Sequence, residues 1–407
     1  MPWMETGPMD QRMRLVAAHQ AGTMTMAEVC RQAGVSRKTG YKWVQRYQVG
    51  GVSGLSDRPR ARQTQAHRTP AAVVDQLLAL KGRHPTWGPK KLVASARALV
   101  ASGQAPDHGP IPAPSTVGAL LQRHGLVRTR RRGRRPLPTS PLLHLADGPN
   151  QVWAADFKGA FAVGDGTVCA PLTITDTHSR YLLRCQALTR THTGIVQALF
   201  EQTFRDYGLP AALRTDNGPP FASTGLAGLT PLAVWWLRLG IRLERITPGR
   251  PQQNGRHERL HRTLGEDALA PPATTIATQQ RAFDRFVAEY NTRRPHEALG
   301  MATPAQVYGP SVRPYPSRLP ELVYPRADHV RQVRPNGALR WQGREIQIAH
   351  ALAGEPVGLH WVADGQWEVH FGPALLGILD EPAGRCFPVS ARLRPAGAHG
   401  PQADTEG

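Results

Sequence analysis

The stretch VWAADFKGAF, residues 152–161, decides the fold of the central part of this 407-residue chain. Apolar residues stand on both sides of Asp156, a pattern typical of a strand that is buried in a sheet. A carboxylate inside such a strand needs a partner or a metal ion, because burying an unpaired charge is costly. The stretch therefore predicts a buried strand with a functional acidic residue in it.

Two further acidic residues lie in settings of the same kind. Asp216 follows a short strand-like run in ALRTDNGPPF, residues 212–221, and its Asp-Asn-Gly sequence is typical of a tight turn. Glu258 lies in PQQNGRHERLHRTL, residues 251–264, where leucines at helical spacing predict a helix from about Asn254. Asp216 is thus expected at the mouth of a strand, and Glu258 in the first turns of a helix.

Three carboxylates on rigid elements suit one kind of chemistry. An enzyme that moves a phosphodiester bond holds two divalent cations about 3.5–4 Å apart, one at the attacking oxygen and one at the leaving oxygen. Mg²⁺ prefers oxygen ligands and keeps several waters, so a few carboxylates suffice to hold it. The candidate catalytic residues and metal ligands are Asp156, Asp216 and Glu258.

The segments between these residues predict an α/β domain. Strand-like runs are expected from Val168 to Thr175 and from Tyr181 to Leu188, and a helix is expected from Thr193 to Tyr207. An apolar helix from Pro231 to Leu239 precedes the segment that contains Glu258. The order strand, strand, strand, helix, strand, helix, helix is that of a ribonuclease H-like α/β domain.

The motifs DFKG, TDNGPPF, ITPGRPQQNGRHERLHRTL and YNTRRPHEALGMATPAQVY occur in this order, and on them residues 142–310 resemble the catalytic core of DDE transposases of bacterial insertion sequences, the group closest to retroviral integrases. The resemblance implies a recombinase that cleaves DNA at the 3′ ends of its element and joins the new 3′-hydroxyls to target DNA. It also implies two Mg²⁺ or Mn²⁺ ions per active site, held by the three acids. The gap from Asp216 to Glu258 is longer than is usual in the family, which an insertion in the loop Phe221–Thr230 explains at little entropic cost.

Composition indicates DNA as the partner. The formal net charge of +20 predicts attraction to a polyanion, with an affinity that falls with salt. The excess of arginine over lysine suits bidentate phosphate contacts, and a GC-rich genome would give the same bias. Cys30, Cys169, Cys185 and Cys386 lie far apart, which argues against a zinc finger or a disulfide framework. No apolar run reaches membrane length, so we expect a cytoplasmic, nucleoid-associated bacterial protein with no membrane partner.

Residues 1–55 are expected to form a helix-turn-helix DNA-binding domain. Met26 to Ala33 predicts the first helix, and Ser36 is the expected cap of a second helix that reads DNA. Gly40 weakens this second helix by about 1 kcal/mol relative to alanine. A generic helical domain with a solvated basic face is the alternative. The side chains expected to contact DNA are Arg37, Lys38, Lys42 and Arg46.

A second helix-turn-helix DNA-binding domain is expected in residues 70–126, after a polar and basic linker in residues 56–69. It is similar to the second helix-turn-helix of the same transposases, and two modules in tandem would read a longer end sequence than one. Trp87 is expected in its core rather than stacked on a base. The predicted helices are Ala71 to Lys81, Lys90 to Val100 and Thr116 to His124, the last capped by Ser115.

Residues 127–141, VRTRRRGRRPLPTSP, are the densest positive stretch of the chain. A charge run is usually a solvated, disordered segment. An arginine-rich linker between DNA readers and a catalytic core can also lie along phosphates or in a minor groove and become ordered on binding. Both interpretations apply here, and the side chains expected to contact DNA are Arg130, Arg131, Arg132, Arg134 and Arg135.

Other polar residues of the core are expected to support the three acids. Arg256 and Arg259 would hold the DNA backbone, and Asn217 would orient Asp216 or contact a phosphate. Asp176 is expected in a turn, since Asp-Thr-His-Ser has turn chemistry. The supporting residues are Asn217, Asn254 and Gly255.

The composition changes after residue 310. A Pro-rich connector occupies residues 311–328, and short alternating stretches punctuated by glycine in residues 329–392 predict a small β-barrel. Residues 393–407 are expected to be a disordered tail. The predicted fold class is multidomain, with N-terminal all-α helix-turn-helix modules, a central α/β ribonuclease H-like catalytic core and a C-terminal small β-barrel.

Three functions are compatible with parts of this pattern. An active recombinase uses all three acids, whereas a catalytically silent, element-derived DNA-binding protein would use only the helical modules and need not keep the acids. A ribonuclease H that acts on hybrids would leave two DNA-reading modules and the barrel without a role. Because two element ends usually need two or more active sites, the recombinase is expected to act as a homo-oligomer bound to element ends and target DNA.

Overall fold

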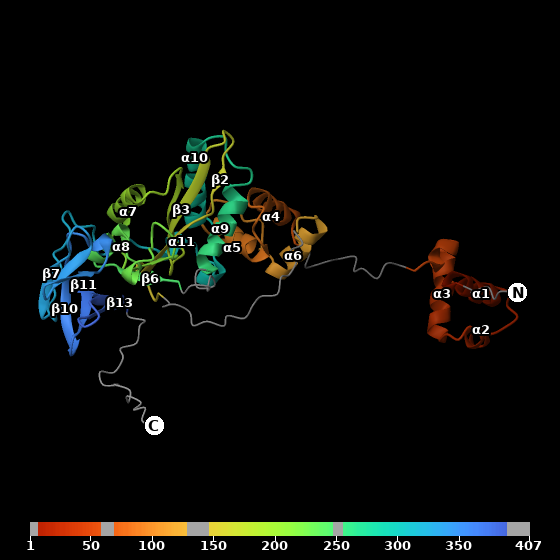
Figure 1. The fold of residues 1–407 in the computed structure, drawn as a ribbon. Helices are drawn as coiled ribbons and strands as arrows, with labels where there is room; N and C mark the ends of the chain where they lie inside the picture. The colour runs from red at the N-terminus through yellow and green to blue at the C-terminus, as the bar shows by residue number, and fades with distance from the viewer. Residues whose placement is uncertain (1–6, 58–68, 128–145, 247–254, 389–407) are drawn as a thin grey trace, which may run out of the picture. The chain divides into compact units, whose positions relative to one another are not determined.

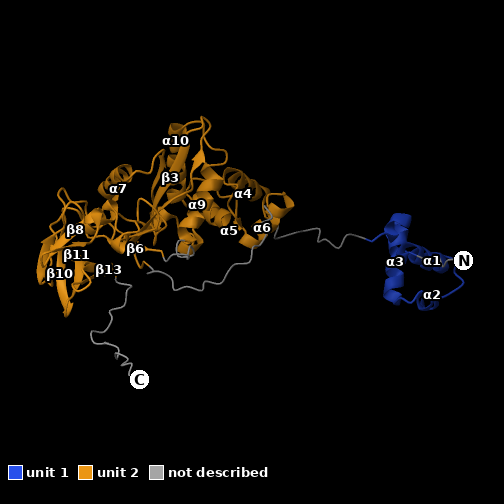
Figure 2. Ribbon diagram, viewed as in Figure 1, with its two compact units in different colours: residues 1–68 blue, residues 69–407 orange. Residues whose placement is uncertain are grey.

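The structure is a computed structural model that describes residues 7–57, 69–127, 146–246 and 255–388. The chain divides into two compact units, residues 1–68 and residues 69–407 (Figures 1 and 2). The order of elements confirms the predicted fold class, with helical modules first, an α/β core next and strands last. Within the described ranges, no helix is both long enough and apolar enough to cross a bilayer.

The first unit is a three-helix domain that ends in a short 3-10 helix. Its elements are α1 (Pro8–Gln20), α2 (Met26–Gln32), α3 (Arg37–Gly50) and η1 (Gly51–Leu55). The sequence predicted α2 and α3 but not α1, whose Leu15 and Val16 are buried in the same core as Trp43. Ser36 caps α3 as predicted, because its hydroxyl accepts a hydrogen bond from the backbone N–H of Thr39 at 3.2 Å.

Gly40 lies inside α3 for a packing reason. A Cβ atom at this position would lie 2.3 Å from the Sγ of Cys30 on α2, which is too close for any side chain. The glycine therefore lets the two helices approach, and this packing offsets its backbone entropy cost in the helix interior.

The second helical module opens the larger unit. Its elements are α4 (Ala71–Arg83), α5 (Pro89–Ala101) and α6 (Pro114–Arg123). Trp87, between α4 and α5, is 1% exposed, which confirms it as a core residue. The predicted cap Ser115 is wrong. The helix α6 begins two residues earlier than predicted, at Pro114, with Ala113 in the N-cap position, because proline at the first helical position loses no intrahelical hydrogen bond.

A six-stranded mixed sheet forms the centre of the larger unit. Its strands are β1 (Val152–Phe157), β2 (Phe161–Ala162), β3 (Val168–Asp176), β4 (Leu182–Leu188), β5 (Ala212–Thr215) and β6 (Arg242–Arg245). The order is β2-β3-β1-β5-β6, and β4 pairs with β3. The strands β4, β3 and β1 are antiparallel neighbours, while β1, β5 and β6 run parallel. This is the mixed sheet of a ribonuclease H-like core.

Helices cover both faces of this sheet (Figure 1). They are α7 (Thr193–Tyr207), α8 (Pro231–Arg238), α9 (Gly255–Ala268), α10 (Ile276–Thr292) and the short α11 (Pro304–Val307), with the 3-10 helices η2 (Leu226–Gly228) and η4 (Glu297–Leu299). Trp153 and Leu213 point from the sheet into a core with α7 and α8. Leu182 and Cys185 point into a separate core with α9 and α10. The two helical layers hold the sheet rigid between them.

The C-terminal part consists of a five-stranded antiparallel sheet and a hairpin that share one core. The strands of the sheet follow the order β13 (Arg385–Pro388), β12 (Ala374–Asp380), β11 (Gln366–Phe371), β10 (Pro356–Ala363) and β7 (His329–Gln332). The hairpin is β8 (Ala338–Trp341) with β9 (Arg344–Gln347), and η5 (His350–Leu352) follows it. The strand-rich domain that the sequence predicted is therefore present, built from two sheets around a common interior.

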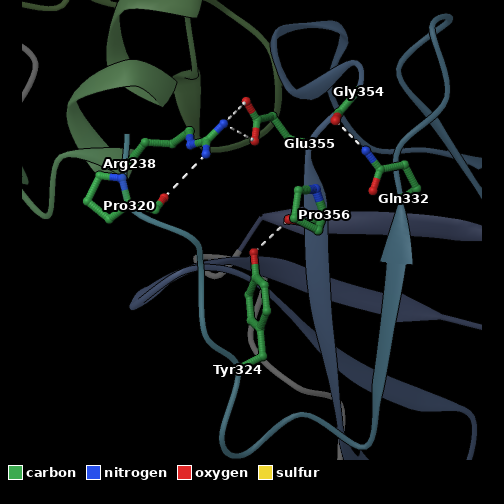
Figure 3. A network of polar contacts seen from close by, with 7 residues as sticks. All are labelled: Arg238, Pro320, Tyr324, Gln332, Gly354, Glu355 and Pro356. Carbon is green, nitrogen blue, oxygen red and sulfur yellow. Dashed lines mark hydrogen bonds and ion pairs between the residues drawn. The ribbon is translucent and has the colours of Figure 1, made fainter. Parts of the chain in front are cut away.

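This domain packs directly on α8 of the core. Leu229, Ala233 and Leu237 belong to the same apolar cluster as the C-terminal strands. Figure 3 shows the polar edge of the contact, where Arg238 forms an ion pair with Glu355 at 3.2 Å and also donates to the carbonyl oxygen of Pro320. Nearby, the hydroxyl of Tyr324 donates to the carbonyl oxygen of Pro356, and Gln332 bonds to Gly354 (Figure 3). The apolar cluster and this polar edge together attach the domain to the sheet of the core.

Candidate active site

Asp156 and Asp216 occupy equivalent positions on neighbouring parallel strands. In the pairing of β1 with β5, Val152 lies opposite Ala212 and Ala154 lies opposite Arg214, an offset of 60 positions (212 − 152). The two acids have the same separation (216 − 156 = 60), and Asp216 is the first residue after β5. Adjacent strands are about 4.8 Å apart, and alternate residues face the same side. Both acids therefore belong to the same edge and the same face of the sheet.

Glu258 lies in the first turn of α9, the helix that covers this face. The neighbouring side chains His257 and Leu260 are buried against the sheet, whereas Glu258 is exposed. One residue along a helix is a rotation of about 100°, so Glu258 lies at the border of the packed stripe. The helix begins at Gly255, close to its predicted start.

Asp156 lies beside two histidines of α9 that the sequence analysis did not select. Ligand atoms of Asp156, His257 and His261 all lie within 4.8 Å of one another, and Asp216 and Glu258 are not members of this cluster. The hydroxyl of Thr173, the residue opposite Asp156 on β3, is 2.6 Å from Nε2 of His257 and 2.8 Å from Nε2 of His261. The spacing of two histidines at i and i+4, on one face of a predicted helix, was the signal in the sequence.

The Thr173 hydroxyl connects three elements. It lies 3.1 Å from the backbone carbonyl oxygen of Asp156, to which it donates. A hydroxyl has one proton, so both imidazoles act as donors through Nε2–H when that bond is formed. Strands β1 and β3 are thereby tied to α9 at the level of Asp156.

Both histidines are neutral at physiological pH. Burial, together with the neighbouring His261, lowers the pKa of His257 well below its ordinary value. Burial and the nearby Lys158 lower the pKa of His261 to about 4. The two rings therefore add no positive charge beside Asp156, and they position α9 through hydrogen bonds and packing alone.

The turn after β5 is fixed by its own hydrogen bonds. The side chain of Asn217 donates to the carbonyl oxygen of Ile246 at 2.7 Å, which joins this turn to the end of β6. The carboxylate of Asp216 accepts from the backbone N–H of Gly218 at 3.3 Å. The side chain of Asn217 thus ties this turn to the backbone at the end of β6. Asp176 is the last residue of β3, and its buried carboxylate stabilises the turn that follows, because it accepts from the backbone N–H and the hydroxyl of Ser179.

The side chains expected to contact DNA differ in their exposure and in the contacts that they already make within the protein. Arg37, Lys38 and Lys42 are exposed on α3. Arg46 is half-buried, stacks over Trp43 and donates to the carbonyl oxygen of Ser56 at 2.7 Å, so it is engaged inside its own domain. The predicted contacts Arg130, Arg131, Arg132, Arg134 and Arg135, and the supporting residue Asn254, lie outside the described residues.

In the core, Arg259 is exposed on α9. Arg256 is exposed as well, but its Nη1 donates to the backbone carbonyl oxygen of Thr177 at 3.0 Å. A part of this side chain is therefore directed at the sheet and not only at solvent.

The sheet order, the two covering helical layers and the acids at one sheet edge define the class of an integrase-type α/β core. Comparison with known families agrees, since residues 146–251 and residues 239–304 match the integrase core domain. Residues 11–63 match a helix-turn-helix domain, residues 39–121 a homeodomain-like domain, and residues 328–385 the C-terminal domain of IS481 family transposases. The chain therefore carries an integrase core domain, helix-turn-helix domains and a C-terminal segment that is similar to that of IS481 family transposases.

Two of the similar proteins are described as proteins of insertion elements, and others are retroviral polyproteins. The chain is 30% identical over 182 residues to a 39.2 kDa protein of element IS476 from Xanthomonas euvesicatoria, across 44% of this chain and 50% of the relative. It is 29% identical over 189 residues to a 31.7 kDa protein of element IS407 from Burkholderia multivorans, across 46% of this chain and 66% of the relative. The chain thus matches half to just under two thirds of the length of these relatives.

Among solved structures, the HTLV-2 integrase catalytic core domain in complex with magnesium aligns with 40% of this chain and with all of its own chain. The sequence identity is 18% and the TM-score is 0.32.

Proposed function

We propose that this protein binds the ends of its insertion element and catalyses metal-dependent cleavage at the DNA 3′ ends, followed by strand transfer into target DNA. Asp156, Asp216 and Glu258 are the proposed catalytic residues. One observation carries the proposal. The offset of 60 positions between β1 and β5 equals the separation of the two aspartates, and α9, which bears Glu258, packs on the same face of the sheet.

The residues at this edge fit the divalent cations of the family. Carboxylate oxygens are the ligands that Mg²⁺ and Mn²⁺ prefer, and the acids come from two strands and a helix that are held rigid by packing on both faces. Asp156, Asp216 and Glu258 would hold two such ions, which activate the attacking oxygen and stabilise the leaving oxygen of a phosphodiester.

The protein's own contribution is to position the acids. The hydrogen bonds of Thr173 fix α9 against β1 and β3, and so set the place of Glu258 relative to Asp156. Because His257 and His261 are neutral, they do not compete with a cation for the carboxylates by charge. The exposed basic residues of α3, Arg37, Lys38 and Lys42, would contact DNA in the first module, and Arg259 would contact it near the acids.

The active species is proposed to be a homo-oligomer on DNA. Two element ends must be cut and joined, and each chain carries one set of the three acids. The net charge of +20 attracts the protein to DNA of any sequence, and the assembly would form there.

The test is a nicking and joining assay on labelled DNA that carries the sequences flanking the gene, with Mg²⁺ or Mn²⁺. The wild type is expected to give 3′-end products that Asp216→Asn does not give, since the amide cannot replace a charged ligand. Asp364→Asn, at an exposed position of the C-terminal domain, is the matched control and should behave as the wild type. Sequence-specific binding without products from any variant would instead establish the silent DNA-binding protein.

A further inference from the structure

The helix α9 directs a pair of histidines at the sheet. The segment HERLH, residues 257–261, places His257 and His261 four positions apart, so both lie on one face of the helix. Their ring centroids are 4.8 Å apart, and the rings are nearly perpendicular. Two histidines in an H-E-x-x-H segment of a helix are an arrangement that binds zinc in other proteins. The pair is therefore a candidate for part of a metal site.

Strand β1 supplies a third group. Asp156 pairs with Thr173 of β3, so the two side chains face the same side of the sheet. The Thr173 hydroxyl is 2.6 and 2.8 Å from the Nε2 atoms of the two histidines, which places both rings on that side. One ligand atom each of Asp156, His257 and His261 lies within 4.8 Å of the others. We name these three residues the histidine–aspartate cluster.

The donor set of this cluster favours a transition metal over Mg²⁺. Mg²⁺ prefers oxygen ligands, whereas imidazole nitrogen suits Zn²⁺ and its neighbours in the first transition series. Both imidazoles are neutral, as a histidine that binds a metal has to be. Histidine nitrogen and carboxylate oxygen are common ligands of four-coordinate Zn²⁺. The cluster supplies three such ligands.

The cluster needs only a small contraction to hold such an ion. Bonds of about 2.0–2.1 Å to a four-coordinate Zn²⁺ put neighbouring ligand atoms about 3.3 Å apart. The present limit of 4.8 Å exceeds this separation by about 1.5 Å. His257 is 2% exposed and fixed by packing. Asp156 and His261 are half-buried, so their side chains can turn inward and leave a path for the ion from solvent.

The surroundings provide the remaining contacts. A metal-bound histidine usually donates its other ring N–H to an oxygen. When Nε2 of His257 binds an ion, the ring proton moves to Nδ1, which lies 3.5 Å from the hydroxyl oxygen of Thr175. A water molecule or the Thr173 hydroxyl completes the four ligands. Lys158 opposes the ion, since its charge already contributes to the low pKa of His261.

We infer that the histidine–aspartate cluster binds one Zn²⁺ ion at a site of its own, beside the two-metal site proposed for the three acids. Asp216 and Glu258 are not members of the cluster, whereas Asp156 belongs to both sites. A carboxylate oxygen that is bound to Zn²⁺ is withdrawn from the catalytic cations, so Zn²⁺ would hold the protein inactive until it is removed. This consequence rests on the proposed function, whereas the Zn²⁺ site does not.

The visible absorption of Co²⁺, a spectroscopic substitute for Zn²⁺, tests the site without any reaction. Four-coordinate Co²⁺ absorbs visible light much more strongly than six-coordinate Co²⁺ held by carboxylates and water. The metal-free full chain is titrated with Co²⁺ in the absence of DNA. The wild type is expected to develop the strong bands with one ion per chain, and Zn²⁺ should then abolish them.

Two substitutions on different elements should remove these bands. His261→Gln takes a nitrogen ligand from α9, and Asp156→Asn takes the charged ligand from β1 while it keeps the shape of the side chain. Each should weaken Co²⁺ binding by about 100-fold or more, because loss of an outer-shell partner alone costs about 10–100-fold. His124→Gln, at an exposed histidine that follows α6, is the matched control and should bind as the wild type does.

Lys158→Gln gives a change in the opposite direction. It removes the opposing charge and should strengthen Co²⁺ binding several-fold, a gain that no loss of folding can produce. Asp216→Asn should keep the bands and the affinity of the wild type. Loss of the bands in Asp216→Asn would overturn the inference, because the ion would then lie between the two aspartates. Weak bands in the wild type, or strong bands at unchanged affinity in His261→Gln, would overturn it as well.

The consequence is measured in the nicking and joining assay with Mg²⁺ in excess. Zn²⁺ at concentrations that fill the cluster should stop product formation by the wild type, and a several-fold lower concentration should suffice for Lys158→Gln. Undiminished products from a protein with a filled cluster would contradict the inhibition. If the wild type gives no products even without Zn²⁺, the proposed function fails, while the Co²⁺ spectra still decide the metal site.

Discussion

Both helical modules have an apolar core between three helices, but only one of them forms a compact unit by itself. The first, α1 to α3, forms a compact unit by itself. The second, α4 to α6, is part of the unit that contains the integrase core. Its loop and α5 reach α10 and the segment after it, through His84 with Glu289 at 2.8 Å and Lys90 with Glu297 at 3.0 Å.

The second module and the core also enclose a cavity. It has a volume of about 490 Å³ and is lined by residues 83–87 of the module, by residues of α9 and α10, among them Asp267, and by Arg294, which follows α10. Lys91 of α5 is half-buried near Arg294, and burial lowers its pKa to about 8. The second module thus joins the larger unit through polar contacts of its loop, while its apolar side chains form a core that is separate from the core of the sheet.

The largest expected effect comes from Trp87→Ala. Trp87 fills the core of the second module and stacks on His84, which contacts the integrase core. The loss of such a buried ring costs about 3–5 kcal/mol. Calorimetry should show a lower transition temperature for the larger unit and an unchanged one for the first unit. Trp361→Ala, at a site that is 50% exposed, is the control. Unchanged amide exchange in α10 would show that the second module is energetically separate.

Acidification should lower the stability of the larger unit more than that of the first unit. His296, after α10, packs on Tyr290 and has a buried Nε2 without a hydrogen-bond partner. Burial, with Lys91 and Arg294 nearby, lowers its pKa to about 3. In the unfolded state His296 takes up a proton as the pH falls through about 6.5, whereas in the folded state it stays neutral until the pH is much lower. The free energy of unfolding therefore decreases below pH 6.5, by roughly 2 kcal/mol at pH 5.

This loss is expected in the larger unit and is checked by thermal unfolding between pH 7 and pH 4.5. His296→Gln should reduce the decline, because glutamine does not take up a proton. His350→Gln, at an exposed histidine, should leave the decline as it is. If both variants follow the wild type, the acid sensitivity has another origin.

Glycine to alanine substitutions should act in opposite directions in the two modules. At Gly40 the added Cβ meets Cys30 Sγ at 2.3 Å, and overpacking costs about 1–3 kcal/mol against a gain in helix propensity of about 1 kcal/mol. At Gly82 in α4 nothing lies within 4 Å, so only the gain remains. Urea titrations should therefore show a net loss of about 1 kcal/mol for Gly40→Ala and a gain of about 0.5–1 kcal/mol for Gly82→Ala. Stabilisation by both would mean that α2 and α3 can move apart at no cost.

The smallest effect is expected from the ion pair of Lys90 with Glu297. The two side chains are 62% and 60% exposed, and such pairs are worth about 0.2–1 kcal/mol. A double-mutant cycle with Lys90→Gln and Glu297→Gln should give a coupling in this range that disappears in 1 M salt. A larger coupling energy that does not depend on salt would show that this ion pair, and not packing, holds the second module on the core.

Most local sequence signals were read correctly, with the exception of the cap of α6, where the helix begins at Pro114 and the predicted cap Ser115 lies inside it. The helix start at Ser36, the turn at Asp176 and the start of α9 next to Gly255 all depend on neighbours within a few residues. The other misses depend on tertiary contacts. The helix α1 has a weakly amphipathic sequence and is held by its packing in the core, and the role of Gly40 follows from a residue ten positions away on another helix.

The same division applies to the candidate site. The three acids were selected from their local settings and from the resemblance of their motifs, and their roles stay proposals. Thr173 was not selected, because a threonine in a strand has no local mark of function. His261 was not selected either, although its spacing of four residues from His257 places both on one face of a predicted helix. Only the pairing of β3 with β1, and the packing of α9 on both, brings their side chains together.

The sequence by itself determined the order of strands and helices, the caps and turns, the basic charge and the separation of 60 positions between the two aspartates, because these are properties of short segments or of composition. Only the tertiary structure decided that this separation equals the register of two parallel strands and that the second module is part of the unit that contains the core. Register and packing depend on which distant apolar faces are buried against each other, and no window of the sequence contains both faces.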